Sequence, residues 1–501
     1  MEDTTFLYSV LGIALLVAIS YALKPKSRKN LPPTPPSIPI IGHLHLLKPP
    51  VHRSLLTLSQ KYGPVLSLRF GSRLVVVVSS IDAAEECFTK NDVVFANRPD
   101  FAVSKCLSYN HTTLGAAPYG DHWRKLRRVS ALEILSANRL NTNSAIRRDE
   151  VRRLVNKLSQ SSRDDFARVE FKSMVKELTL NITMRMVAGK RYYGEETDES
   201  SEAMTFRAIV DELFEFMLAQ YPADFLPILK YIDFQGFMKR AKKLIKRVDA
   251  FWQGIVDEHR TNQIHNQEME NSMVAHFLKL QESQPQYYTD DIIKGLILTM
   301  VLGGSDTTAV TIEWAMSNLL NHPTVLKKAR AELETQLGDQ LLEESEVPKL
   351  SYLRCIVLET LRLYPAGPLL LPHKSSADCT LSGYDVPRDT ILLVNAWAIH
   401  RDPTLWEDPT SFRPERFEGG DGEANSKLMI AFGLGRRACP GSGMAHRVLG
   451  LTLGLLIQCF DWKSIDGKDV DMTEGKGVSM PKAEPLEALC KPRPIASKLL
   501  L

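Results

Sequence analysis

The sequence lacks the features that identify several common classes of protein. Its seven cysteines are odd in number and include no C-x-x-C pair, which argues against a disulfide scaffold and a structural zinc site. It has no excess of one charge: 62 Lys and Arg stand against 59 Asp and Glu, and a net charge of +3 gives no electrostatic case for nucleic-acid binding. Repeats, low-complexity tracts and a clear linker are absent from residue 50 onward. With 44% apolar and 24% charged residues, the composition excludes a collagen, a disordered chain and a multi-spanning membrane protein.

The body of the chain, residues 50–501, is predicted to be one large, mainly helical α+β domain. Strand-like segments occur at 65–80 and 390–399, and helical patterns occupy 147–159, 201–220, 291–321 and 357–363. Strands near both ends of a mostly helical body favour an α+β architecture in which helix dominates.

The N-terminus begins with a hydrophobic run. Residues 6–23 contain no charged side chain, which is near the short limit for crossing a bilayer. A basic cluster follows at 24–29, while Glu2 and Asp3 precede the run, so the Lys/Arg bias places the body on the cytosolic side. A cleaved signal peptide is the alternative, but its first residues would be basic and these are acidic. We therefore predict a single-pass membrane anchor at 1–23.

The segment 24–49 is predicted to be a basic, proline-rich hinge between this anchor and the body. Five prolines between residues 32 and 39 cannot continue a helix and favour extended backbone. A proline-rich ligand for a signalling domain is the alternative, but Ile38, Ile40 and Ile41 favour packing on the domain.

Cys439 lies in a sequence that suits a metal-binding thiolate. The stretch FGLGRRACPG at 432–441 precedes an apolar helical pattern, and Pro440 is expected in the first helical turn. Free N–H groups and the positive end of the helix dipole are expected to lower the pKa of the thiol. Arg437 supplies a nearby cation, and three glycines would let the backbone approach a flat, bulky group. These are Gly433, Gly435 and Gly441. A thiolate ligand to haem iron accounts for the whole set.

Two other interpretations of this region were weighed. A lone cysteine is most often a buried structural residue. The spacing Gly433-x-Gly435-x-x-Ala438 also imitates a dinucleotide-binding fingerprint, because it follows an apolar segment and opens a helix. Only residues 462–501 follow the acidic residue Asp461, too few for the rest of a dinucleotide-binding half, so we reject that fingerprint.

The spacing F-x-x-G-x-R-x-C-x-G resembles the haem-binding signature of the cytochrome P450 family. The matching residues are Phe432, Gly435, Arg437, Cys439 and Gly441. The resemblance implies haem b (iron protoporphyrin IX) as cofactor, with the Cys439 thiolate as its axial ligand and the other four residues in the cofactor-binding site. Further matches run from the N-terminal anchor to Cys439 in the family's order. The fold implied is the cytochrome P450 fold, a helix-rich haem domain with small β sheets and an N-terminal transmembrane helix.

The helical pattern at 291–321 is interrupted by GGSDTT at 303–308. Two glycines in mid-helix cost about 1 kcal/mol each relative to alanine, so a close approach of the backbone to a ligand is expected. The stretch resembles the family's [AG]-G-x-[DE]-T-[TS] motif over the distal haem face, which implies catalytic roles for Asp306 and Thr307. A hydroxyl can hydrogen-bond dioxygen and position water, while a carboxylate resupplies protons for heterolytic O–O cleavage. The alternative is a bent core helix in which Thr caps a backbone carbonyl.

A charge motif also matches the family. Glu359 and Arg362 are spaced i,i+3, so they share one helix face, and Arg416 lies in the PERF stretch at 414–417. Alone, such a pair is more often solvated. Their order and distance from Cys439 resemble the family's E-x-x-R pair and its partner arginine, which implies a buried structural network behind the cysteine loop.

Five residues are candidates for binding the haem propionates. Trp123 and Arg127 match the family's W-x-x-x-R pattern, in which the indole N–H and the guanidinium hold these carboxylates. The resemblance places further contacts at Arg98, His373 and Arg437. A lone histidine such as His373 is more often an ordinary surface or core residue.

The resemblance implies a monooxygenase, which inserts one atom of O2 into a C–H or C=C bond and reduces the other to water. Since we find no convincing flavin or NADPH site, electrons are expected from a separate NADPH-cytochrome P450 reductase on the same endoplasmic reticulum membrane. Arg124, Lys125, Arg128 and Arg436 are candidates for its docking face, with a merely solvated charged face as an equal alternative. A haem-thiolate isomerase or dehydratase that needs no reductase, and a non-catalytic haem sensor, are the alternative functions.

The local sequence around Cys439 is most similar to plant microsomal members of the family. That group includes isoflavone hydroxylases, methylenedioxy-bridge enzymes and triterpenoid hydroxylases, which implies a lipophilic specialised metabolite such as a flavonoid, lignan or triterpenoid as substrate. The candidate pocket walls are 101–119, 206–221, 300–307, 367–371 and 478–480. Their apolar character supports a lipophilic substrate.

Overall fold

The computed structural model describes most of the body of the chain. The described residues are residue 12 and residues 30–162, 165–197, 200–218, 221–231, 233, 236–261, 267–477 and 479–499. The predicted anchor and the basic cluster at 24–29 lie outside them apart from residue 12, so both stay predictions. Within the described part, one helical stretch, Asp290–Asn321, is long and apolar enough to cross a membrane, and 67% of its most apolar window is buried inside the protein. That burial is typical of a core helix.

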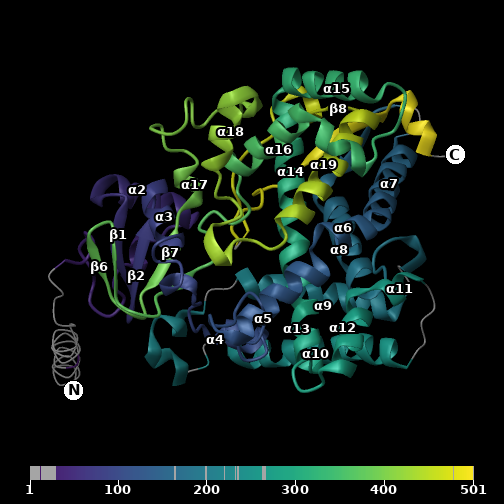
Figure 1. Ribbon diagram of the computed structural model, residues 1–501. Coiled ribbons are helices and arrows are strands. Elements are labelled where there is room, and N and C mark those ends of the chain that lie inside the picture. Colours follow the sequence, from purple (N-terminus) through teal and green to yellow (C-terminus); the bar gives the residue numbers. More distant parts are fainter. Residues whose placement is uncertain are drawn as a thin grey trace, which may run out of the picture.

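Helices form the greater part of the body (Figure 1). They are α2 (Val51–Tyr62), α3 (Ile81–Phe88), α4 (Ala102–Leu107), α5 (Asp121–Val129), α6 (Ala137–Thr142), α7 (Ser144–Ser161), α8 (Phe171–Ala188), α9 (Ser201–Leu218), α10 (Phe237–Arg260), α11 (Gln267–Asn271), α12 (Met273–Ser283), α13 (Asp290–Gly304), α14 (Asp306–Asn321), α15 (Pro323–Leu337), α16 (Ser351–Leu363), α17 (Ala396–Ile399), α18 (Gly419–Lys427) and α19 (Ser442–Cys459). The helices expected at 147–159 and 357–363 are confirmed as parts of α7 and α16, and the one expected at 201–220 is confirmed as α9 over 201–218, since residues 219–220 lie outside the described ones.

A four-stranded sheet stands at one edge of the helical body (Figure 1). β1 (Val65–Phe70) and β2 (Arg73–Val78) form an antiparallel hairpin, which confirms the strand-like segment at 65–80. β7 (Ile391–Val394) pairs with β2 in parallel, and β4 (His373–Lys374) closes the order β1-β2-β7-β4. Alternating side chains of these strands enter two separate apolar clusters, so both faces of the sheet are covered.

The strand expected over 390–399 is only half correct. β7 ends at Val394, and the side chain of Asn395 accepts a hydrogen bond from the N–H of Ala398, which starts the short helix α17. An Asx side chain that bonds backbone N–H groups favours a helix start over a continued strand. Periodicity alone does not distinguish a short buried strand from a buried helix turn.

Two smaller sheets complete the β structure among the described residues. β3 (Ala167–Glu170), β9 (Glu487–Pro492) and β8 (Phe460–Lys463) form an antiparallel set, and β5 (Cys379–Leu381) pairs with β6 (Tyr384–Val386). The predicted fold class, mainly helical with small β sheets, is confirmed.

The central helix is broken where the sequence predicted an interruption. α13 ends at Gly304 and α14 begins at Asp306, with Ser305 between them at φ −96° and ψ −68°. α14 runs through the middle of the body and packs against α8, α16 and α19 (Figure 1). At the break itself Ser305 is buried, while Gly303 and Thr307 on either side of it are exposed, so the break borders open space inside the fold.

Candidate active site

The loop before α19 presents Cys439. The backbone N–H of Cys439 donates to the carbonyl of Phe432 at 2.8 Å, which closes the loop 432–439. α19 begins at Ser442 with Gly441 as its N-cap, so Pro440 precedes the helix and does not occupy its first turn as we expected. Solvent reaches the Cys439 side chain, unlike that of a structural core cysteine, although many protein atoms surround the sulfur.

The pKa of the Cys439 thiol is raised, so the predicted net decrease is wrong. Burial of the sulfur among protein atoms is the largest effect and raises the pKa. The backbone N–H groups of Gly441 and Ser442 and the charge of Arg127 act in the predicted direction but do not outweigh it. These groups are the donors that would stabilise a thiolate.

The glycines of the loop have different roles. Gly435 has φ +65°, and a Cβ there would lie 2.6 Å from Asp92 Oδ1 and 2.7 Å from the carbonyl oxygen of Phe88. Its conformation serves the close packing of the loop on the end of α3, which corrects our expectation that it makes room for a bulky group. Gly441 differs, because a Cβ there would lie 3.8 Å from the sulfur of Cys439, an ordinary contact.

Four basic side chains from distant parts of the sequence meet beside this loop. Burial and the charges of Arg98 and Arg127 lower the pKa of Arg437 to about 9, and burial lowers that of Arg98 to about 10. Burial and the charges of Arg98 and Arg437 also hold the pKa of His373 well below its usual value. Among the described residues, none of the three arginines has a carboxylate within 4.0 Å. Half-buried cations without anions are costly, so this cluster suits a ligand that carries carboxylates.

Backbone carbonyls hold these cations in place. Arg98 donates to the carbonyls of Leu371 and Pro372 at 3.0 and 2.9 Å. Arg437 donates to the carbonyls of Ala96 and Ala117 at 2.7 and 2.5 Å. Neutral carbonyls orient a guanidinium without neutralising it, so the positive charge stays available to a ligand.

Trp123 supports the cluster in a way we did not foresee. Its indole N–H donates to the carbonyl of Leu114 at 3.2 Å, and the guanidinium of Arg437 lies 4.3 Å from the centre of its ring. Trp123 therefore provides a platform for Arg437 by cation–π contact, while its N–H is bonded to the protein itself.

The cluster and the thiol together fit haem. Haem offers two propionates, which suit the uncompensated guanidiniums of Arg98, Arg127 and Arg437, and an iron that a thiolate can bind. Arg127 connects the basic cluster to the cysteine loop. Its charge acts on the Cys439 thiol and partly opposes the rise in pKa that burial causes. A Cβ on Gly303 of α13 would meet no atom within 4 Å, so open space adjoins the helix break.

The acid and the alcohol of the helix break are both accessible. Thr307 is exposed, and its hydroxyl donates to the carbonyl of Gly303 at 2.9 Å, as expected for a bent helix in which Thr caps a carbonyl. Asp306 is half-buried, and its carboxylate accepts a hydrogen bond from Ser479 Oγ at 2.6 Å. The second glycine has a packing role, since a Cβ on Gly304 would lie 3.4 Å from Thr183 Oγ1 of α8.

Glu359, Arg362 and Arg416 meet in a buried charge network. Arg362 and Glu359 are fully buried and form two hydrogen bonds of 2.7 and 2.8 Å. Arg416 donates to Glu359 at 3.0 Å from η9 (Pro414–Phe417). Arg362 also donates to the carbonyls of His400 and Pro409 at 2.6 and 2.7 Å.

His400 connects this network to the cysteine loop, and the sequence analysis missed it. Its Nδ1 lies 3.2 Å from the carbonyl oxygen of Arg362, and its Nε2 accepts the N–H of Ile430, two residues before the loop, at 3.0 Å. Burial and the charges of Arg362 and Arg401 lower the pKa of His400 to about 3, so the ring is neutral. No spacing rule signals a contact that spans so much sequence.

The candidate docking residues are not equivalent. Arg124, Lys125 and Arg128 are exposed on α5. Arg436 donates to Asp92 at 2.6 Å and to Tyr119, so its charge is largely neutralised within the protein.

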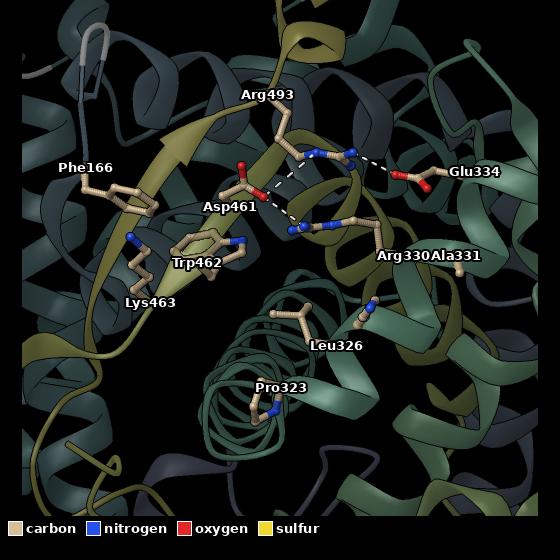
Figure 2. A pocket seen from close by; sticks show the side chains of 11 residues that line it. Phe166, Pro323, Leu326, Arg330, Ala331, Glu334, Asp461, Trp462, Lys463 and Arg493 are labelled. Carbon is tan, nitrogen blue, oxygen red and sulfur yellow. Dashed lines mark hydrogen bonds and ion pairs between the residues drawn. The ribbon is translucent and has the colours of Figure 1, made fainter. Parts of the chain in front are cut away.

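A surface groove of about 750 Å³ lies away from these residues, between α15 and β8 (Figure 2). Its charged side chains pair with one another: Arg330 with Asp461 at 2.8 Å and Arg493 with Glu334 at 2.7 Å. It contains none of the site residues, so it is not the active site.

Comparison with known proteins agrees with this geometry. Residues 32–487 match the family model of cytochrome P450. The chain is 57% identical to cytochrome P450 81Q32 of Catharanthus roseus, over 100% of this chain and 99% of that one. It is 54% identical to an isoflavone 2'-hydroxylase of Glycyrrhiza echinata, over 98% of both chains, and 49% identical to a (+)-piperitol/(+)-sesamin synthase of Sesamum radiatum, over 99% of both.

A solved structure supports the fold. A zebra fish cytochrome P450 with progesterone superimposes with a TM-score of 0.76 at 24% identity, covering 89% of this chain and 100% of that one. Haem is the cofactor of this family, and the donor set described above suits it. The chain belongs to the cytochrome P450 family and is a haem-thiolate monooxygenase.

Proposed function

We propose that this enzyme oxidises a lipophilic specialised metabolite with an aromatic ring system, such as an isoflavonoid or a lignan. The reaction is either hydroxylation or the oxidative closure of a methylenedioxy bridge. Similarity over nearly the whole chain to proteins named isoflavone 2'-hydroxylase and (+)-piperitol/(+)-sesamin synthase is the observation that carries this proposal. Because small apolar differences change specificity by only about 1 to 3 kcal/mol, a triterpenoid remains a further candidate.

Cys439 is the proposed axial ligand, and Arg98, Arg127, Arg437 and His373 are proposed to surround the propionates. When bound, haem supplies the redox chemistry that activates O2 and cleaves its O–O bond. The overall reaction consumes the substrate, O2, two electrons and two protons, and yields the oxidised product and water. The protein must therefore bind the substrate, exclude bulk water and deliver the protons.

Asp306 and Thr307 are proposed to deliver those protons. Thr307 presents its hydroxyl at the helix break beside the open space at Gly303. The half-buried Asp306 can exchange protons with solvent and pass them toward Thr307. This pair favours oxygen activation over an isomerase, a dehydratase or a haem sensor, which have no need to deliver protons to oxygen.

The redox partner proposed is an NADPH-cytochrome P450 reductase that docks on α5. Arg124, Lys125 and Arg128 are exposed there, close in sequence to the propionate candidates Trp123 and Arg127. Cations on this surface would complement an acidic partner.

We further propose that the chain is anchored in the endoplasmic reticulum membrane by residues 1–23, with 24–49 as hinge and 50–501 as the cytosolic haem domain. Large apolar side chains are exposed next to the point where the hinge joins the domain: Ile38 at 45%, Ile40 at 51%, Ile228 at 70% and Tyr231 at 92%. Gly71 links the two segments, because its N–H donates to the carbonyl of Ile41 and a Cβ there would collide with the carbonyl of Phe225. Such an apolar patch suits a lipid surface.

The test is the absorbance spectrum of the reduced enzyme with carbon monoxide. We expect the long-wavelength Soret band of thiolate-ligated haem, and its loss in Cys439→Ser. Cys459→Ser is the matched control, since Cys459 is fully buried at the end of α19. A band at the position typical of imidazole-ligated haem, in folded protein, contradicts the Cys439 assignment.

A further inference from the structure

The carboxylate of Asp306 has an unusual partner for an acid in a protein interior. Among the described residues, Ser479 Oγ is the hydrogen-bond donor that reaches it, and no Lys, Arg or His nitrogen lies within 4.0 Å. An arginine or lysine partner would hold the carboxylate as a permanent anion. A hydroxyl partner orients the carboxylate without placing a positive charge beside it.

Ser479 belongs to a segment fixed on both sides of the site. The next residue, Met480, donates its N–H to the carbonyl of Ala366 at 3.0 Å and accepts the indole N–H of Trp314 at 2.7 Å. Trp314 lies on α14, two turns after Asp306, and stacks on Tyr364 at 4.0 Å between ring centres. The segment is therefore attached both to the helix that carries the acid and to the residue that precedes 367–371.

Two candidate pocket walls are thus connected to the acid. Residues 478–480 and 367–371 are expected to contact the substrate, and the described Met480 joins the first wall to Ala366 at the start of the second. Because Ser479 and Met480 are adjacent, Ser479 Oγ cannot move far while both backbone bonds of Met480 persist.

We propose that Ser479 is a positioning residue that holds Asp306 for proton delivery. The inference rests on the proposed role of Asp306 and adds a second residue from a different part of the chain. The proton path balances without ionising Ser479: the carboxylate oxygen of Asp306 that Ser479 does not hold takes a proton from solvent hydronium and passes it toward Thr307, while Ser479 keeps its own proton and its hydrogen bond to the other oxygen. One proton is transferred and Ser479 is unchanged.

The half-buried position of Ser479 suits this role. A fully exposed hydroxyl would not hold a carboxylate in one place, because water would compete for the hydrogen bond. The half-buried Asp306 keeps its other oxygen within reach of solvent.

The test compares four variants in the full-length, haem-loaded enzyme with its reductase. Ser479→Ala removes the donor, Ser479→Thr keeps a hydroxyl, and Asp306→Asn removes the acid. The control is Thr473→Ala, which removes a hydroxyl that donates to Asp471 at the same distance of 2.6 Å in the same region, away from Asp306. The probe is an isoflavone that the native enzyme turns over. We measure product per NADPH, hydrogen peroxide release, the absorbance shift on isoflavone binding and turnover driven by cumene hydroperoxide.

Ser479→Ala should lower product per NADPH by about threefold to tenfold and raise peroxide release, because misplaced proton delivery lets reduced oxygen escape. Ser479→Thr and Thr473→Ala should stay within about twofold of native. Isoflavone affinity and hydroperoxide-driven turnover of Ser479→Ala should also stay within about twofold, since a hydroperoxide brings its own proton and electrons.

If Ser479→Ala forms as much product per NADPH as the native enzyme while Asp306→Asn forms less, the inference is overturned and the proposed function stays intact. An equal loss of hydroperoxide-driven turnover in Ser479→Ala also overturns it, because that result indicates a structural role. If Asp306→Asn keeps native coupling, the proposed role of Asp306 fails and the inference fails with it.

Discussion

Glu359 shows how one buried side chain organises the region behind the active-site loop. Its carboxylate accepts from Arg362, from Arg416 and from the backbone N–H of Arg413 at 2.8 Å. His400 then carries the connection from Arg362 to Ile430 and the cysteine loop. A buried ion pair contributes little net stability against an apolar replacement, but removal of one partner leaves a charge unpaired. The network is therefore better explained by the loop geometry it fixes.

We predict that Arg362→Ala loses haem. The change leaves Glu359 buried without its main partner, a loss of about 3 to 5 kcal/mol, and it frees the carbonyls that Arg362 holds. The ratio of haem absorbance to protein measures the loss. Lys349→Ala is the matched control, because Lys349 forms an exposed i,i+3 pair with Glu346 at 2.7 Å, worth about 1 kcal/mol or less. Normal haem content in Arg362→Ala would refute the role of the network.

At the scale of elements, α19 is the helix on which the cysteine loop depends. Two glycines four residues apart place one face of α19 against its neighbours. A Cβ on Gly450 would lie 2.4 Å from Val347 Cγ1 of η8 (Glu344–Lys349), and one on Gly454 would lie 2.2 Å from Leu342 Cδ2. Leu342 is 1% exposed, so it has little room to move away. The close approach fixes α19, and with it the position of Cys439.

We predict that Gly454→Ala destabilises the protein by about 1 to 3 kcal/mol, because the added methyl group overpacks this contact. The measurement is chemical denaturation followed by circular dichroism. Gly443→Ala, on the same helix, is the control: its Cβ would lie 3.7 Å from Leu140 Cδ1, an ordinary contact, and stability should not fall. Equal stability of both variants would show that the helix shifts freely and would contradict the argument.

Glu474 attaches α2, the first helix of the body, to α17. Its carboxylate lies 2.8 Å from His52 Nε2 and accepts from Arg53 of α2 at 2.8 Å, and it accepts the indole N–H of Trp397 of α17 at 2.9 Å. Burial alone would raise the pKa of Glu474, but the bonds from His52 and Arg53 outweigh it and lower the pKa to about 2. A depressed carboxyl pKa adds stability above its unfolded value and loses it as pH falls. We predict a loss of stability between about pH 4.5 and pH 2, seen in unfolding curves, that Glu474→Gln reduces.

At the scale of the whole molecule, distant segments build a single site. The loop before α19, the α5 region, the β4 region and the α13–α14 break supply its groups, and α14 crosses the centre between them (Figure 1). The exposed basic side chains lie on α5, whereas β8 lies at the far end of the molecule in the same view (Figure 1). The proposal that the reductase docks on α5 can therefore be tested against a distant surface of the same molecule.

We predict that Lys125→Glu combined with Arg128→Glu raises the apparent KM for the reductase. Charge reversal at exposed positions removes attraction to an acidic partner, and added salt should reduce the difference from native. Steady-state kinetics with varied reductase measure this change. Lys468→Glu combined with Lys476→Glu, two equal charge reversals at exposed residues beyond β8, should have no effect. An unchanged KM in the double variant contradicts docking on α5.

The sequence determined those parts of the site that depend on local spacing. Cys439 stands before an apolar helix, the glycine-rich break precedes Asp306, and the i,i+3 spacing of Glu359 and Arg362 places both on one face, so each was predictable from its neighbours. The same local rules failed at 390–399, where a side-chain cap at Asn395 ended the strand. They also failed for the pKa of Cys439, because the number of atoms that exclude water from a sulfur is not a local property.

Only the tertiary structure decided which distant side chains meet. The bond from Ser479 to Asp306 and the link from His400 to Ile430 span long stretches of sequence, and no periodicity encodes them. The cation–π contact of Trp123 with Arg437 likewise joins residues that are far apart in the sequence. The sequence by itself therefore determined the chemistry of this protein, since reactive groups and helix patterns are properties of residues and their neighbours. The folded chain decided how those groups are held, because burial, charge compensation and hydrogen-bond partners depend on what packing brings together.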